Sequence, residues 1–512
     1  MLNRFVAQNF LSAPANASPW LLLVCLLAGL AGCEQVQSDF VFNEKTQELL
    51  PEAEVKVKNT LVSSFGSPAQ PTIPAFFPVD RGQITLEIAD FDPEKPTELL
   101  IEPVETDADL VGKKLQFLFD PEDQSDVTME AIEEELPDPI AELDGITIAA
   151  YDAESGKLTL SKALPDLELI EPGLELAANP NYKLHQGQFL YEQHCQHCHG
   201  VSGSGDGPTA RYMEPKPRDY RKGIFKFTST GSRDHVSTAD LKHIIVEGIP
   251  GTYMPSFKLL SDESLDLIVN YVKFLAMRGE TEGMLNVEVG LDFNKKVLAD
   301  ELEGVTDPKE IEEITTEFKE DMNEFLEVDY PEIAFFGQLD LADAWIEADN
   351  EDAIVYASVP QTDPYGPSAA DPSLTSIENG RILYLGKDAQ CASCHGDGGK
   401  GDGFQTRQLQ KRREGGDFTV PGLHDDWYNP LKPRDLTSDI YRGGRRPIDI
   451  FRRIYVGIKG TPMPAFGGKS LTDQQIWDVV NYVMYLPHED TMSIPKLPKA
   501  EASEGPAVSS IE

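Results

Sequence analysis

Apolar residues recur at the spacing of an amphipathic helix in several parts of the chain. They suit one helix at residues 181–194 and a second at residues 265–275. The apolar positions are Leu184, Phe189, Leu190 and Tyr191 in the first, and Leu265, Ile268, Val269, Val272 and Leu275 in the second. An acidic helical pattern also runs around residues 308–325. These patterns predict a mainly α protein.

The pattern changes between residues 83 and 161, where short runs are typical of β-strands. The runs lie at residues 84–88, 115–119 and 158–160. The last of them follows an Ala-Glu-Ser-Gly turn, a composition that punctuates strands. We therefore expect a small β-rich module, also acidic, within residues 81–180.

The formal net charge of −43 is concentrated in two regions. Residues 34–180 contain roughly 33 acidic against 9 basic residues, and residues 279–375 roughly 26 against 4. Residues 181–278 and 376–490 are nearly neutral, so we expect them to form two domains joined by an acidic linker that contains the 308–325 helix, with residues 491–512 as a tail. The acidic regions are interpreted as solvated surface. Nucleic acid is excluded as a partner, because its phosphates would repel such a chain.

The N-terminus has the features of an export signal. Arg4 precedes an apolar run at residues 20–30 that is too short to span a bilayer, so residues 1–32 are predicted to be a cleaved signal peptide. The run ends in Leu30-Ala31-Gly32-Cys33, which resembles the lipobox of bacterial lipoproteins. That resemblance implies a lipidated Cys33 as the first mature residue, in a protein anchored to a bacterial membrane and facing the periplasm. The alternative is an incidental cysteine in an ordinary signal peptide.

A stretch rich in Pro, Ser and Thr follows the signal region at residues 47–78. Such a composition is typical of a flexible spacer. Residues 33–80 are therefore interpreted as a tether that lifts the domains off the membrane.

Cysteine usage is unusual for an exported chain. Two of the six cysteines, Cys25 and Cys33, lie in the signal region, and the other four form two pairs, each followed at once by histidine. The motifs are Cys195-Gln196-His197-Cys198-His199 and Cys391-Ala392-Ser393-Cys394-His395. The C-x-x-C-H spacing predicts covalent haem attachment, in which two thiols add to the vinyl groups and the histidine ligates the iron. A redox-active dithiol or a four-cysteine zinc site are the alternatives, but neither explains the histidines.

Further motifs repeat in the same order after each attachment motif. The first half has Gly205-Asp206-Gly207, Lys216-Pro217-Arg218-Asp219, Gly251-Thr252-Tyr253-Met254-Pro255 and Val269-Asn270-Tyr271-Val272. The second has Gly401-Asp402-Gly403, Lys432-Pro433-Arg434-Asp435, Gly460-Thr461-Pro462-Met463-Pro464 and Val480-Asn481-Tyr482-Val483. This order resembles the class I cytochrome c family over roughly two-fifths of the chain. It is also similar to the dihaem third subunit of cbb3-type oxidases and to related mono- and dihaem cytochromes.

The resemblance implies two cytochrome c domains, residues 181–278 and 376–490, each with one covalently bound haem c. It implies that Met254 and Met463 are the distal iron ligands, opposite His199 and His395. The alternative for each methionine is a core position, the usual place of this side chain. Three histidines are rival distal ligands, but none has a counterpart in the other repeat. They are His235, His243 and His424.

The family also implies details around each haem. The first and last helices should cross where a glycine meets a tyrosine, at Gly187 and Tyr271 and again at Gly380 and Tyr482. A proline carbonyl should accept the second N–H of the proximal histidine, and Pro208 fits this role, whereas the second domain has Phe404 in that place. Basic residues of the second domain are expected either to bind haem propionates or partners, or to form a solvated face. They are Lys411, Arg412, Arg413, Arg442, Arg445, Arg446, Arg452 and Arg453.

The expected function is electron transfer, because iron with six ligands has no open position for a substrate. The chain is thus expected to be a carrier rather than an enzyme, or a subunit of an oxidoreductase complex. Its expected partners are redox proteins such as a respiratory complex or a terminal oxidase. The chain differs from the third subunit of cbb3-type oxidases, because it has a lipobox where that subunit has a membrane-spanning helix. The alternatives are a dihaem peroxidase, in which one iron must lose a ligand, and a module that haem merely stabilises.

Overall fold

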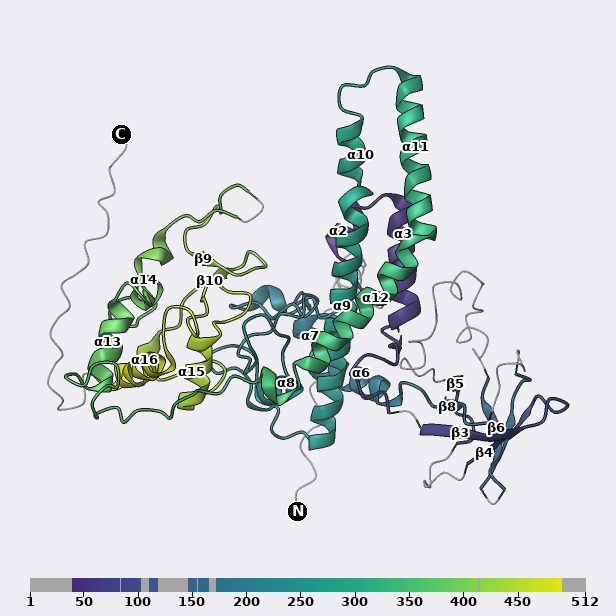
Figure 1. The fold of residues 1–512 in the computed structure, drawn as a ribbon, viewed down its shortest axis with the longest axis horizontal. Coiled ribbons are helices and arrows are strands. Elements are labelled where there is room, and N and C mark those ends of the chain that lie inside the picture. Colours follow the sequence, from purple (N-terminus) through teal and green to yellow (C-terminus); the bar gives the residue numbers. More distant parts are fainter. Residues whose placement is uncertain are drawn as a thin grey trace, which may run out of the picture.

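The computed structural model describes residues 39–82, 84–102, 110–117, 146–153, 155–164, 172–412 and 415–489. The predicted signal peptide, Cys33 and the predicted tail lie outside the described residues. The described chain is mainly helical, as predicted, with one six-stranded sheet. Figure 1 places this sheet at one end of the molecule, the C-terminal helices at the other, and a group of upright helices between them. No helix in the described ranges is long and apolar enough to cross a membrane.

The predicted β-rich module is an antiparallel sheet with strand order β5-β8-β3-β4-β7-β6. Its strands are β3 (Ile84–Phe91), β4 (Glu98–Ile101), β5 (Leu115–Phe117), β6 (Ile148–Asp152), β7 (Lys157–Leu160) and β8 (Glu175–Ala178). The runs at residues 84–88 and 158–160 are confirmed in β3 and β7, and residues 115–117 of the remaining run form β5, whereas residues 118 and 119 lie outside the described residues. In β3 the buried Leu86 and Ile88 alternate with exposed or half-buried neighbours, as a half-buried strand requires.

The helices of the first predicted domain are α6 (Tyr182–His194), α7 (Gln196–His199), α8 (Thr238–Glu247) and α9 (Asp262–Asp292). Helix α6 packs across α9 at Gly187, where a Cβ would lie 2.4 Å from Leu267 O and 3.1 Å from Tyr271 Cβ. The predicted contact between Gly187 and Tyr271 is therefore confirmed. A side chain at this position would force the two helices apart.

The second predicted domain repeats this crossing. Its helices are α13 (Ser376–Leu385), α14 (Cys391–His395), α15 (Pro447–Tyr455) and α16 (Asp473–Tyr485). A Cβ at Gly380 would lie 1.9 Å from Asp478 O and 3.0 Å from Tyr482 Cβ. A short hairpin of β9 (Leu423–His424) and β10 (Pro430–Leu431) lies in the insert that lengthens this repeat. The second predicted glycine–tyrosine contact is thus confirmed as well.

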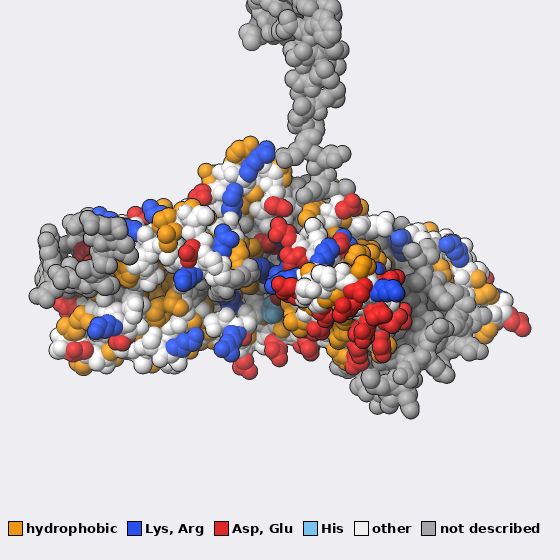
Figure 2. Space-filling view, turned by 90° about the horizontal axis from the view of Figure 1, so that it is seen from above, with side chains coloured by type: hydrophobic (Ala, Val, Ile, Leu, Met, Phe, Trp, Pro, Cys, Tyr) orange, Lys and Arg blue, Asp and Glu red, His pale blue; other side chains and the backbone are white. Residues whose placement is uncertain are grey.

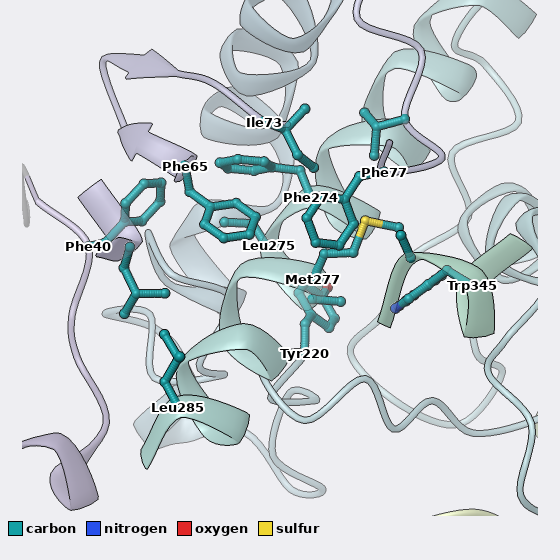
Figure 3. Close-up of a cluster of buried hydrophobic side chains, with 14 of the residues drawn as sticks. Phe40, Phe65, Ile73, Phe77, Tyr220, Phe274, Leu275, Met277, Leu285 and Trp345 are labelled. Carbon is teal, nitrogen blue, oxygen red and sulfur yellow. The ribbon is translucent and has the colours of Figure 1, made fainter. Parts of the chain in front are cut away.

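The predicted tether differs from the structure. Residues 44–65 form α2 (Glu44–Glu48) and α3 (Pro51–Phe65), and α3 packs along α9. The buried side chains of α3 are spaced four residues apart and form a single stripe: Ala53, Val57, Leu61 and Phe65. Figure 3 shows Phe65 against Phe274 of α9, with their ring centroids 6.0 Å apart. The helical stripe outweighs the Pro, Ser and Thr content that predicted a spacer.

The predicted acidic linker also differs in part. Helix α9 continues past the predicted boundary at residue 278, and α10 (Lys295–Glu301), α11 (Pro308–Glu327) and α12 (Asp329–Glu347) follow it. The predicted 308–325 helix is confirmed as α11. Its buried Phe318, Met322 and Leu326 join the same apolar cluster as α3 and α9. Acidic side chains gather on the outer face of this helical group (Figure 2).

Replacing Gly187 or Gly380 by alanine should destabilise the folded protein by about 1–3 kcal/mol, the usual cost of overpacking a core. The new Cβ would meet a backbone carbonyl of the partner helix, which cannot rotate away as a side chain can. Chemical denaturation followed by circular dichroism measures the change. Gly283→Ala is the matched control, because Gly283 also lies on α9 but has no atom within 4 Å of a new Cβ. Equal effects of all three substitutions would contradict this account.

Candidate functional site

Each attachment motif forms a single helical turn. Helix α7 follows α6 after Cys195, and α14 begins at Cys391. Residues three and four apart lie on the same side of a helix, so each turn presents both cysteines and the histidine toward one space. Glycines with positive φ, Gly200 at +77° and Gly396 at +78°, end the two turns. The carbonyls of these glycines accept hydrogen bonds from Tyr191 Oη at 2.9 Å and Tyr384 Oη at 2.8 Å.

A backbone carbonyl orients each predicted proximal histidine. His199 Nδ1 lies 3.1 Å from Arg218 O, and His395 Nδ1 lies 3.0 Å from Arg434 O. A carbonyl can only accept, so Nδ1 carries the proton and the lone pair of Nε2 is left for a metal. The predicted acceptor, the carbonyl of Pro208, is therefore wrong. Since the Lys-Pro-Arg-Asp motif supplies the carbonyl in both repeats, Phe404 does not leave the second domain without an acceptor.

Burial sets the protonation states of these groups. It lowers the pKa of His199 to about 4, and it also lowers the pKa of His395, so both rings are neutral near pH 7. Burial raises the pKa of the Cys195 and Cys391 thiols to about 12. A redox-active dithiol requires an accessible thiolate, which such burial disfavours. Cys195 and Cys391 also lie against separate apolar clusters, and the described residues contain no group of three or more side chains that could hold a metal ion, so the pairs do not form one zinc site.

The two methionine loops have the same hydrogen bonds. Met254 N donates to Thr252 Oγ1 at 3.1 Å, and Met463 N donates to Thr461 Oγ1 at 3.3 Å. The methionine carbonyls accept from Ile249 N and Ile458 N at 3.1 and 3.2 Å. Each loop follows a helix and a positive-φ glycine: α8 is capped by Gly248, and α15 is capped by Val456 just before Gly457. The sequence repeat is therefore also a repeat of backbone geometry.

A cavity of about 680 Å³ lies at the first site. Four predicted haem residues line it together: Cys195, Cys198, His199 and Met254. Apolar side chains cover much of the remaining wall, among them Leu241, Ile245, Ile268 and Val272. Two thiols, one imidazole nitrogen and one thioether around an apolar cavity of this size are a donor set that fits a covalently attached haem. In the second domain, Met463 and Cys391 pack against one apolar cluster.

None of the rival histidines lines this cavity. His235 Nε2 is 2.8 Å from Glu280 Oε1, His243 is exposed, and His424 stacks on Phe418 with ring centroids 3.7 Å apart. His194 and His197 also belong to the cavity wall, although the His197 side chain is exposed. The methionine thus remains the predicted distal ligand of the first site.

Arg412, Arg445, Arg446 and Arg453 have partners within the second domain, whereas Arg452 has one in the preceding linker. Arg445 and Arg446 pair with Asp439 and Asp449, Arg452 donates to Val355 O, and Arg453 donates to Asp449 O and Arg442 O. Arg412 lies over the rings of Phe418 and Tyr428. Arg413 lies outside the described residues. Arg442 differs from these, because it lines the cavity of the first domain.

The second domain closes part of the first cavity. Asp425, Trp427, Asn429 and Arg442 belong to its wall. Sequence reasoning missed the first three, since the insert that carries them has no counterpart in the first repeat. The contact between the domains is reciprocal. A Cβ at Gly251 would lie 3.1 Å from Arg434 Nη1, and a Cβ at Gly460 would lie 3.0 Å from Arg218 Nη1.

Comparison with known protein families agrees with this geometry. Residues 183–272 match the family model of cytochrome C oxidase, cbb3-type, subunit III, and residues 377–487 match that of cytochrome c. The chain is therefore a c-type cytochrome with two domains. Cytochrome c domains bind haem c covalently and transfer electrons.

One solved chain, from a reducing HAO-like protein complex of Kuenenia stuttgartiensis, is 24% identical, with 59% of this chain and 95% of that chain covered and a TM-score of 0.37. No curated protein matches.

Replacing Tyr191 or Tyr384 by phenylalanine should lower the free energy of unfolding by about 1–3 kcal/mol, because each change leaves a buried glycine carbonyl without its donor. Denaturation followed by haem absorption measures the loss. Tyr212→Phe is the control, because this tyrosine is 72% exposed. A loss no greater than that of the control would mean that the hydroxyl does not hold the attachment turn.

Proposed function

We propose that each domain holds one haem c and that the protein transfers electrons between redox partners. The observation that carries this proposal is the repeat itself. Each repeat has a C-x-x-C-H turn, an imidazole fixed by a Lys-Pro-Arg carbonyl, and a Gly-Thr-x-Met-Pro loop with the same hydrogen bonds. The coincidence of these features in both halves supports two complete sites of one kind.

Bound haem supplies a one-electron couple, and the residues of the chain set its properties. Cys195 and Cys198 would hold the first haem, and Cys391 and Cys394 the second. His199 and His395 would each offer Nε2, since Nδ1 already donates to a carbonyl. Met254 and Met463 would offer thioethers, which favour ferrous iron and raise the reduction potential. With both axial positions filled, neither site would bind a substrate.

The proposal extends to location and partners. The lipobox sequence at Cys33 supports export and a lipid anchor in a bacterial membrane, with the domains facing the periplasm. There the protein would exchange electrons with redox proteins of a respiratory chain, such as a respiratory complex or a terminal oxidase.

Replacing Met254 or Met463 by histidine should lower the reduction potential of one haem only, because imidazole stabilises ferric iron relative to thioether. The sulfur-to-iron charge-transfer band of the oxidised protein should fall by about half in either variant. Alanine at the same position should open the iron to carbon monoxide. Met322→Leu is the control, since Met322 is buried on α11 and does not line the first cavity. A parent protein that lacks the band, or binds carbon monoxide at one haem, would favour the peroxidase alternative for that domain.

Replacing Cys33 by serine should release the protein from the membrane fraction, because stable anchoring of this kind depends on the attached acyl chains. Mass spectrometry of the parent should find a diacylated Cys33 at the mature N-terminus. A parent that begins at another residue, or a variant that stays on the membrane, would contradict the anchor without bearing on electron transfer.

A further inference from the structure

Three buried hydrogen-bond donors at the first cavity have no partner among the residues that the structure describes. They are Arg218 Nη2, Trp427 Nε1 and Arg442 Nε, and all three residues line the cavity. Buried donors without an acceptor are rare in native proteins. Three of them at one cavity, contributed by two domains, indicate a ligand that accepts hydrogen bonds there.

The charges at this place indicate that the ligand is an anion. The Arg218 guanidinium lies over the Trp427 ring, 4.0 Å from its centroid, and its Nη2 atom is buried. Burial, followed by repulsion from Arg218 and Arg442, lowers the pKa of Lys226 to about 7, although Asp425 opposes the shift. Asp425 Oδ1 already accepts from the backbone of Trp427 and Asn429. In the cavity wall as a whole the basic residues outnumber the acidic ones, with Arg211, Lys216, Arg218, Lys226 and Arg442 against Asp206, Asp219 and Asp425.

We propose that the propionate carboxylates of the first haem bind at this interdomain site, accepting hydrogen bonds from Arg218, Trp427 and Arg442. The inference rests on the proposed haem of the first domain. A haem carries two carboxylates, and the planar guanidinium groups of arginine are well suited to bind carboxylate oxygens. The second domain would then complete the haem pocket of the first.

The second domain does not offer the same site through the equivalent arginine. Arg434 Nε donates to Ile440 O at 2.8 Å, and its Nη2 donates to Ser438 Oγ at 3.1 Å. The hydrogen bonds of Arg434 are exposed to solvent, whereas Arg218 Nη2 is buried without an acceptor among the described residues. The two repeats are therefore alike in their iron ligands but differ in the surroundings of this arginine.

Two variants of the full-length protein test the site. Trp427→Phe keeps the ring beneath Arg218 and removes only the indole donor, and Arg442→Gln removes one cation. Each should shift the redox equilibrium of the first haem about tenfold toward ferric iron, ~59 mV for a one-electron couple, because the propionates lose a neutralising contact. The potential of the second haem should not change. Redox titration followed by absorption gives both potentials, and Met254→His identifies which belongs to the first haem.

Arg445→Gln is the matched control, because Arg445 is an exposed arginine three residues from Arg442 and pairs with Asp439. It should leave both potentials unchanged. If the first potential stays constant in Arg442→Gln and Trp427→Phe, or if both potentials shift equally, the inference is wrong. If Trp427→Phe does not fold, Arg442→Gln decides alone. Fewer than two haems per chain in the parent, measured as the pyridine haemochrome, would contradict the proposed function instead.

Discussion

The hydrogen bond between His199 and the carbonyl of Arg218 is the constraint on which the rest of the first site depends. It fixes the imidazole, so the Lys-Pro-Arg-Asp segment must pass directly beneath the attachment turn. The segment comes so close that a Cβ at Gly205 would lie 2.6 Å from Pro217 O. In the second repeat, a Cβ at Gly401 would lie 2.5 Å from Pro433 O. The Gly-Asp-Gly and Lys-Pro-Arg-Asp motifs therefore occur together, because the backbone of the second motif leaves no room for a side chain at the first glycine of the first motif.

Features that depend on neighbouring residues could be predicted from the sequence. The attachment turns depend on residues that are three and four apart. The apolar residues of α11 recur at helical spacing, and the strand-forming residues of β3 and β7 form uninterrupted runs. The tether was misjudged because α3 has few apolar residues, and their spacing of four carried more information than its composition. The predicted boundary at residue 278 lies within α9, because the change in charge along the chain does not coincide with the end of this helix.

Contacts between distant segments were harder to predict. The carbonyl that holds the proximal histidine lies 19 residues after it in one domain and 39 in the other, so no fixed spacing identifies it. The repeated Lys-Pro-Arg-Asp motif is the signal in the sequence that could identify this carbonyl. Trp427 gave no such signal, since the indole gains its position only from the docking of one domain on the other.

The reciprocal contact between the repeats has a consequence for the proposed electron path. Arg218 fixes the first imidazole through its carbonyl and meets the Gly460 loop of the second domain through its side chain. A displacement of the second domain would therefore act on the first haem through one residue. If the propionates of the first haem bind the buried donors, their negative charge is neutralised there and ferrous iron is favoured. Because Arg434 makes its hydrogen bonds within its own domain, the second haem would lack that contribution. Electrons that enter at the second haem would then pass downhill to the first.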